Sequence, residues 1–141
     1  MYDSIRQSYV KGSPEEIVRQ TVLGSMESLG YPKHLLSVEK SLKECMAFSV
    51  QEGVIPDRRV DIVCYLPKGV HPLIIIECKA DRFSSDAIYQ VIGYNKFIKA
   101  SFIAIANPYE VLTGWYDVGK QQYQFIKTLP SYKDLIQAVY G

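Results

Sequence analysis

Apolar residues near the start of the chain recur with roughly helical spacing, at Ile17, Val22, Leu23, Met26 and Leu29. Before them, residues 13–16 supply a serine that can cap a helix, a proline for its first turn and two acidic residues that suit its positive end. A glycine and a proline within residues 30–32 stop such a helix. The pattern therefore predicts a helix over residues 14–29, preceded by a polar lead-in over residues 1–12.

Strands are predicted where apolar residues alternate with polar ones or form short runs. Residues 59–66 alternate with period two, so Asp61 projects from the opposite face to Val60 and Ile62. Residues 73–79 are almost entirely apolar until they end in charge, which is typical of a strand covered on both faces. Further strands are predicted at 35–42, 46–50 and 101–106 and as a hairpin at 113–118 and 122–126, and further helices at 84–99 and 132–140.

This order of elements predicts an α/β fold in which helices enclose a central mixed sheet. The chain shows no internal repeat and no linker, and its 141 residues are the usual size of one domain. We therefore expect a single domain over residues 1–141.

Composition narrows the class of protein. With 48% hydrophobic and 22% charged residues, the chain is typical of a globular domain, and a net charge of +1 excludes a strongly basic, histone-like protein but leaves room for a local basic groove. The three cysteines form no C-x-x-C pair, which favours reduced thiols over a disulfide or zinc framework. Because no membrane-length apolar run and no secretory signal are present, we expect a soluble, cytoplasmic protein without a membrane partner.

The charged residues at the end of the most apolar predicted strand carry the candidate chemistry. Glu77 and Lys79 project from one face of that strand, about 7 Å apart along the backbone. If the two neighbouring strands pair antiparallel, Asp61 lies beside Glu77, and two adjacent carboxylates usually require a divalent cation. A lysine beside such an ion can orient or deprotonate an attacking water, which suits phosphodiester hydrolysis. The structural alternative is an ordinary ion pair at a sheet edge.

The helix that follows adds an amide and a phenol. Gln90 and Tyr94 are four residues apart, so they share one helix face and can hydrogen-bond a phosphate, a base edge or the carboxylates. The alternative is an amphipathic helix in which Tyr94 packs inward and Gln90 is exposed.

Together these residues resemble the PD-(D/E)xK nuclease superfamily and, more narrowly, the N-terminal nuclease domain of type I restriction enzyme R subunits. The resemblance covers most of the chain and implies a restriction-endonuclease-like α/β/α sandwich with a central mixed β-sheet. It is carried by five short segments in order, at residues 14–19, 30–32, 58–63, 76–80 and 90–95.

The resemblance implies a Mg²⁺ site, in which Mn²⁺ is expected to substitute. Asp61 and Glu77 correspond to metal ligands, and the main-chain carbonyl of Cys78 completes such a shell in this superfamily. Glu16 corresponds to an acidic residue of the first helix that can also reach the metal and act in catalysis. Glu15 competes with Glu16 for this role on sequence alone.

The same resemblance assigns the remaining site residues. Lys79 is expected to assist the attacking water, and Gln90 to be a further catalytic residue. Tyr94 is expected to position DNA. Positive charges that flank the site in sequence are expected to bind DNA phosphates, at Arg58, Arg59, Arg82 and Lys96.

The expected function is therefore that of a metal-dependent DNA endonuclease. R subunits continue into an ATP-driven translocase, whereas this chain contains no phosphate-binding loop sequence. We expect the protein to act alone, as a homodimer, or with a separate DNA-translocating or specificity subunit. The alternative function is a catalytically inactive nucleic-acid-binding or protein-assembly module on the same fold.

Overall fold

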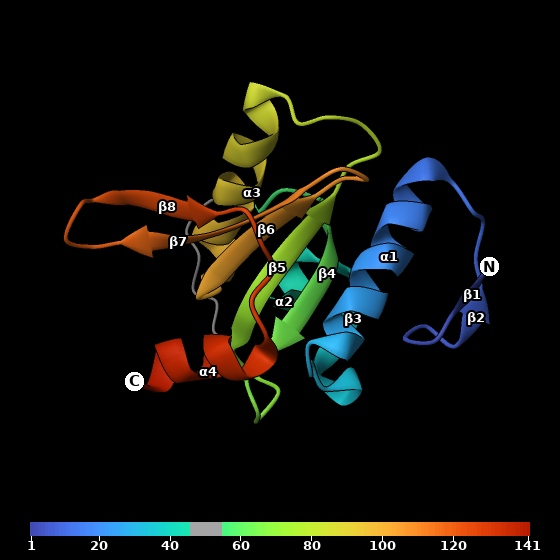
Figure 1. Ribbon diagram of the computed structural model, residues 1–141, viewed down its shortest axis with the longest axis horizontal. Coiled ribbons are helices and arrows are strands. Elements are labelled where there is room, and N and C mark those ends of the chain that lie inside the picture. The colour runs from blue at the N-terminus through green and yellow to red at the C-terminus, as the bar shows by residue number, and fades with distance from the viewer. Residues whose placement is uncertain (46–54) are drawn as a thin grey trace.

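A six-stranded mixed sheet forms the middle of the protein, in the order β3-β4-β5-β6-β7-β8 (Figure 1). In the computed structural model, which describes residues 1–45 and 55–141, β5 and β6 pair in parallel and the other neighbours pair antiparallel. The strands are β3 (Leu36–Ser41), β4 (Arg59–Tyr65), β5 (Pro72–Cys78), β6 (Phe102–Ala106), β7 (Val111–Asp117) and β8 (Gln122–Ile126).

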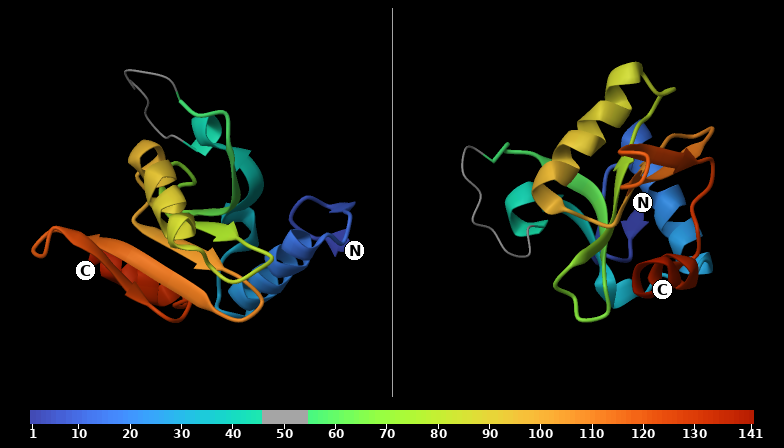
Figure 2. Two further views of the ribbon diagram at one scale, coloured as in Figure 1. Left: turned by 90° about the horizontal axis from the view of Figure 1, so that it is seen from above. Right: turned by 90° about the vertical axis from the view of Figure 1, so that its left-hand side faces the viewer.

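Helices cover both faces of this sheet. The helices are α1 (Pro14–Ser28), α2 (Leu42–Cys45), α3 (Ser85–Ile98) and α4 (Tyr132–Tyr140), with a short 3₁₀ helix at Lys33–Leu35. The two views of Figure 2 place α1 and α4 on one face and α2 and α3 on the other. This α/β architecture with a mixed sheet confirms the expected class. Within the two described stretches of chain, no helix is long and apolar enough to cross a membrane.

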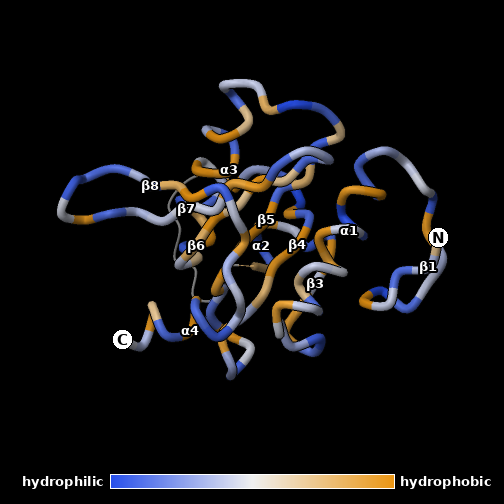
Figure 3. The backbone as a smooth tube through the Cα atoms, viewed as in Figure 1, coloured by the Kyte–Doolittle hydropathy of each residue, from blue (hydrophilic) through white to orange (hydrophobic). Residues whose placement is uncertain are grey.

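The core lies along the central strands. All seven residues of β5 are buried, and Figure 3 shows the apolar colouring concentrated on β4 and β5 and the polar colouring on the tip of the β7–β8 hairpin. Burial on both faces explains why the sequence of β5 is a continuous apolar run. Ala87, Val91, Tyr94 and Ile98 of α3 are buried, as the helical spacing predicts, and Asn95 is buried beside them.

One predicted strand ends differently in the structure. The strand predicted at residues 35–42 ends at Ser41, because residues 42–45 turn into α2, where Leu42 and Cys45 are buried. The strand predicted at 46–50 lies outside the described residues.

The expected polar lead-in is an ordered hairpin, formed by β1 (Tyr2–Asp3) and β2 (Ser8–Tyr9). Asp3 closes its turn, because one carboxylate oxygen accepts from the backbone N–H groups of Ile5 and Arg6 at 2.8 and 2.9 Å. The hairpin packs beside α1 (Figure 1), so the first residues belong to the fold.

Gly114 in β7 faces an aromatic ring of the neighbouring strand. A Cβ atom added there would lie 2.5 Å from Phe125 Cε1 and 3.1 Å from the backbone oxygen of Gln124. We expect Gly114→Ala to lower the free energy of unfolding by about 1–3 kcal/mol, measured by urea denaturation. Gly24→Ala on α1 is the control: nothing lies within 4 Å, so better helix propensity should raise stability by up to about 1 kcal/mol. Unchanged stability in Gly114→Ala would contradict the close approach.

Candidate active site

The acidic residues lie where β4 and β5 separate. Registered pairing of the two strands ends at Ile62 and Ile76. At the next position, side chains replace the backbone ladder: the Cys78 N–H donates to Asp61 Oδ2 at 2.7 Å, and the Asp61 N–H donates to Glu77 Oε1 at 3.3 Å. Each carboxylate is therefore held by the backbone of the opposite strand, and the two acids adjoin one another.

This carboxylate pair is poorly neutralised at Glu77. The residue is 7% exposed, and among the described residues its carboxylate forms no salt bridge. Burial raises the pKa of Glu77 to about 8, and repulsion by the Asp61 carboxylate adds to the rise. The positive charge of Lys79 opposes this effect without cancelling it. A cation at the pair would relieve both causes.

Lys79 and the facing side of α3 complete the polar cluster. Lys79 Nζ donates a hydrogen bond of 3.1 Å to Gln90 Oε1. One helical turn later, Tyr94 is buried against the sheet, and burial together with the Glu77 charge raises the pKa of its hydroxyl. The structure therefore gathers Asp61, Glu77, Lys79, Gln90 and Tyr94 at one end of β5, as the spacing predicts.

Glu16 is the acidic residue of α1 that faces inward, whereas Glu15 is exposed. The N-terminus of α1 is fixed by Ser13, whose hydroxyl accepts from the Glu16 N–H at 3.2 Å. Glu16 contacts the acid pair only through a guanidinium: Arg19 donates to Glu16 Oε1 and to Asp61 Oδ1, both at 2.8 Å. The described residues contain no group of three Asp, Glu, His or Cys side chains placed to hold a metal, so Asp61 and Glu77 are the candidate ligands brought together.

The five candidate DNA-binding residues are dispersed around this cluster. Tyr94 lies within it, and the charge of Arg58 acts on its hydroxyl and opposes the rise in the pKa of Tyr94. Arg59 instead donates to a main-chain carbonyl of β3 at 3.1 Å, and Arg82 lies 4.5 Å over an exposed tyrosine ring of the β6–β7 loop. Lys96 is exposed two residues after Tyr94, about 200° around the helix axis, so it does not face the acid pair.

An open groove of about 580 Å³ adjoins the cluster. Its lining includes Lys79, Gln90 and Glu15 of α1, together with the loop from Ala80 to Ser84 and the first turns of α3. Substrate can therefore approach the lysine from solvent.

Two arginines that bear on the site were not singled out as site residues from the sequence. Arg19 lies three residues after Glu16 on the inward face of α1, and a buried arginine requires acidic partners, so the helix pattern contains a signal for it. Arg6 donates to Glu16 across the loop before α1. No local pattern predicts that contact, because the hairpin was taken for a polar tail.

The raised pKa of Glu77 predicts how stability depends on pH without metal. The folded state retains this proton between about pH 4.5 and about 8, where the unfolded chain has lost it. Stability of the metal-free protein should therefore fall as pH rises across that window, by at most about 1.4 kcal/mol per unit. Urea denaturation at several pH values measures this fall. Glu77→Gln should flatten it, and an equally steep fall in that variant would contradict the assignment.

Comparison with known proteins gives one family. Residues 14–130 match the family model described as "Type I restriction enzyme R protein N terminus (HSDR_N)". The matched region contains α1, all six strands of the central sheet and α3, and hence every residue of the polar cluster. No curated protein and no solved structure matches the chain.

Proposed function

The chain belongs to the family of type I restriction enzyme R protein N termini, and from this membership we propose that it is a metal-dependent DNA endonuclease domain of a restriction system. In this proposal it has the restriction-endonuclease-like fold, with Asp61, Glu77 and Lys79 as its PD-(D/E)xK residues. The observation that carries the proposal is the pair of adjoining carboxylates at the separated ends of β4 and β5, where the buried Glu77 has no ion-pair partner among the described residues.

The donor set fits Mg²⁺. Asp61 and Glu77 offer carboxylate oxygens, which hard divalent cations prefer, and a cation at this pair would offset the burial and the repulsion that raise the pKa of Glu77. Asp61 and Glu77 would hold the ion, with the main-chain carbonyl of Cys78 as a third ligand. When bound, Mg²⁺ would offset phosphate charge and supply an activated water.

The remaining residues of the cluster have distinct roles in the proposal. The hydrogen bond to Gln90 holds Lys79 beside the groove. There the ammonium of Lys79 orients the attacking water and stabilises charge on the phosphate. The water oxygen bonds to phosphorus and releases one proton to solvent, the phosphorus–oxygen bond to the leaving nucleotide breaks, and the leaving oxygen takes up a proton from solvent. In the proposal, Tyr94 and Arg58 contact the DNA backbone.

DNA and other subunits of a restriction system are the proposed partners. The balanced charge of +1 is consistent with weak binding by the isolated chain, because phosphate contacts supply most of the affinity for DNA. A second copy, or a separate translocating or specificity subunit, would provide the missing contacts.

A second candidate function is a non-catalytic module that binds nucleic acid or a partner subunit. The hydrogen bond from Arg19 to Asp61 Oδ1 favours it, because a guanidinium already compensates that carboxylate. Binding of DNA with no cleavage in any divalent metal would support this candidate.

Incubation of the purified chain with supercoiled and linear DNA tests the proposal. Cleavage is expected with Mg²⁺ or Mn²⁺ and should stop on addition of EDTA. Cleavage that persists in EDTA, or that survives in the double variant Asp61→Asn, Glu77→Gln, would overturn the proposal.

A further inference from the structure

A chain of ion pairs connects the N-terminal hairpin to the acid pair. Arg6 Nη2 and Arg19 Nη1 both donate to Glu16 Oε1, and Arg19 Nη2 donates to Asp61 Oδ1. The contacts therefore run from residue 6 to α1 and on to β4. Arg6 and the rest of the hairpin lie before residue 14, where the family match begins.

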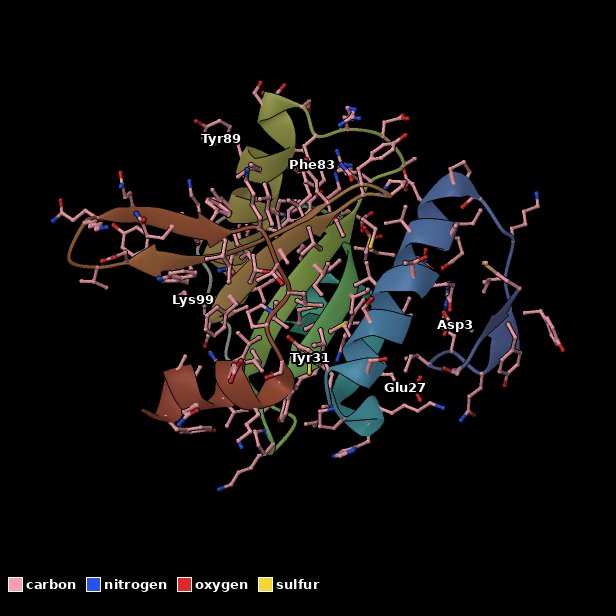
Figure 4. All side chains as sticks on the ribbon, in the orientation of Figure 1. Asp3, Glu27, Tyr31, Phe83, Tyr89 and Lys99 are labelled. Carbon is pink, nitrogen blue, oxygen red and sulfur yellow. The ribbon has the colours of Figure 1, made fainter. Side chains whose placement is uncertain are left out.

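The hairpin is built to hold Arg6 in place. Arg6 Nε donates to Asp3 Oδ2 at 2.7 Å, and Arg6 Nη1 donates to Glu39 Oε2 at 3.2 Å. Asp3 is fully buried and also accepts from Gln20 of α1 at 2.9 Å. Figure 4 labels Asp3 in the space between the hairpin and α1. The guanidinium is thus fixed by three carboxylates from three segments, a geometry that an ammonium cannot reproduce.

Arg19 is the group through which this arrangement reaches Asp61. It is 5% exposed, and its remaining nitrogen, Nε, is buried without a hydrogen-bond partner. Its orientation therefore depends on the carboxylates around it, Glu16 and Asp61 at 2.8 Å and Glu39 at 3.5 Å. If Glu16 shifts, Arg19 shifts with it, and Asp61 loses the contact that fixes Oδ1.

We propose that the N-terminal hairpin is a working part of the active site, in which Arg6 is a positioning residue that acts through Glu16 and Arg19 on Asp61. This inference rests on the proposed function. It assigns Glu16 to positioning Arg19, and it gives the ordered hairpin a role in orienting the metal-binding carboxylate for the ion shared with Glu77.

Arg6→Ala tests the inference with a readout that is independent of cleavage. Partners that orient metal ligands typically contribute about 10- to 100-fold. We expect the Mn²⁺ dissociation constant, measured by calorimetry, to rise about tenfold and kcat for DNA cleavage to fall about tenfold, with KM for DNA unchanged. Arg6→Lys keeps the charge but not the geometry of contacts to three carboxylates, so it should change the Mn²⁺ dissociation constant and kcat in the same directions by smaller factors. It also provides a test if Arg6→Ala does not fold. Lys133→Ala, at an exposed lysine of α4, is the control and should change neither quantity.

The Arg6 side chain is 22% exposed, so a small cation can refill the space that Arg6→Ala leaves. Added ethylguanidinium should restore Mn²⁺ affinity in Arg6→Ala and have no effect on Lys133→Ala. Tighter Mn²⁺ binding in Arg6→Ala would mean that Arg6 only repels the ion. Unchanged Mn²⁺ binding and kcat in both Arg6 variants would show that Arg6 has no role in positioning Asp61. Either result overturns the inference while the proposed function stands. A wild-type chain that binds no Mn²⁺ and cuts no DNA overturns both.

Discussion

Asp61→Asn is expected to abolish both metal binding and DNA cleavage. The variant removes one of two charged ligands and keeps the size of the side chain. Charge stabilisation by a catalytic metal amounts to several kcal/mol, so the cleavage rate should fall by at least about 10³-fold. Plasmid cleavage at saturating Mn²⁺ measures the rate, and calorimetry measures the loss of ion binding.

The same variant has a second consequence that does not depend on activity. The Asp61 carboxylate accepts from the Cys78 N–H and from Arg19, and an amide can accept on only one side. A lost charge-assisted bond should lower stability by about 1–3 kcal/mol at neutral pH. Because repulsion by Asp61 contributes to the raised pKa of Glu77, that pKa should fall in Asp61→Asn. Full cleavage activity with an unaltered pKa of Glu77 would show that the two carboxylates do not act together.

The sequence predicts the fold well where burial alone determines it. The apolar run of β5 and the amphipathic stripe of α3 each correspond to one element of the structure, because the position of every side chain follows from a simple period. The prediction is wrong at Leu42, which was placed at the end of a strand but begins α2, because Leu42 and Cys45 are buried by tertiary packing. The N-terminal hairpin was missed for a related reason: its Asp3 is buried through hydrogen bonds from Arg6 and from Gln20 of α1, which hydropathy does not detect.

The candidate site, like the fold, was predicted where periodic spacing determines it and missed where contacts between distant segments do. The register of β4 and β5 places Asp61 beside Glu77 once antiparallel pairing is assumed, and the spacing of Gln90 and Tyr94 places both on one helix face. Helical spacing did not decide which of Glu15 and Glu16 faces the site, because the apolar stripe of α1 is interrupted. Ile17 is 49% exposed, while Arg19 is buried. The inward turn of Glu16 is stabilised by ion pairs with Arg19, three residues later on the same helix, and with Arg6 of the N-terminal hairpin. The helix pattern can indicate the first of these contacts, but no local pattern contains the second.

Lys79→Met is expected to separate chemistry from metal binding. The substitution keeps an unbranched side chain of similar length but removes the ammonium and its hydrogen bond to Gln90. A group that orients the attacking water and stabilises charge on the phosphate typically contributes about 10²–10³-fold, so cleavage should fall by that factor. The Mn²⁺ dissociation constant should not rise, because Lys79 is not a metal ligand and its loss removes a positive charge beside the acid pair.

Metal binding distinguishes this effect from general damage to the site. Asp61→Asn should lose ion binding and cleavage together, whereas Lys79→Met should lose cleavage alone, and Lys133→Met on α4 should lose neither. A Lys79→Met protein that cuts DNA at the wild-type rate would exclude the lysine from the reaction. One that no longer binds Mn²⁺ would mean that Lys79 supports the acid pair structurally, through Gln90 and α3, because an ammonium cannot itself coordinate the ion.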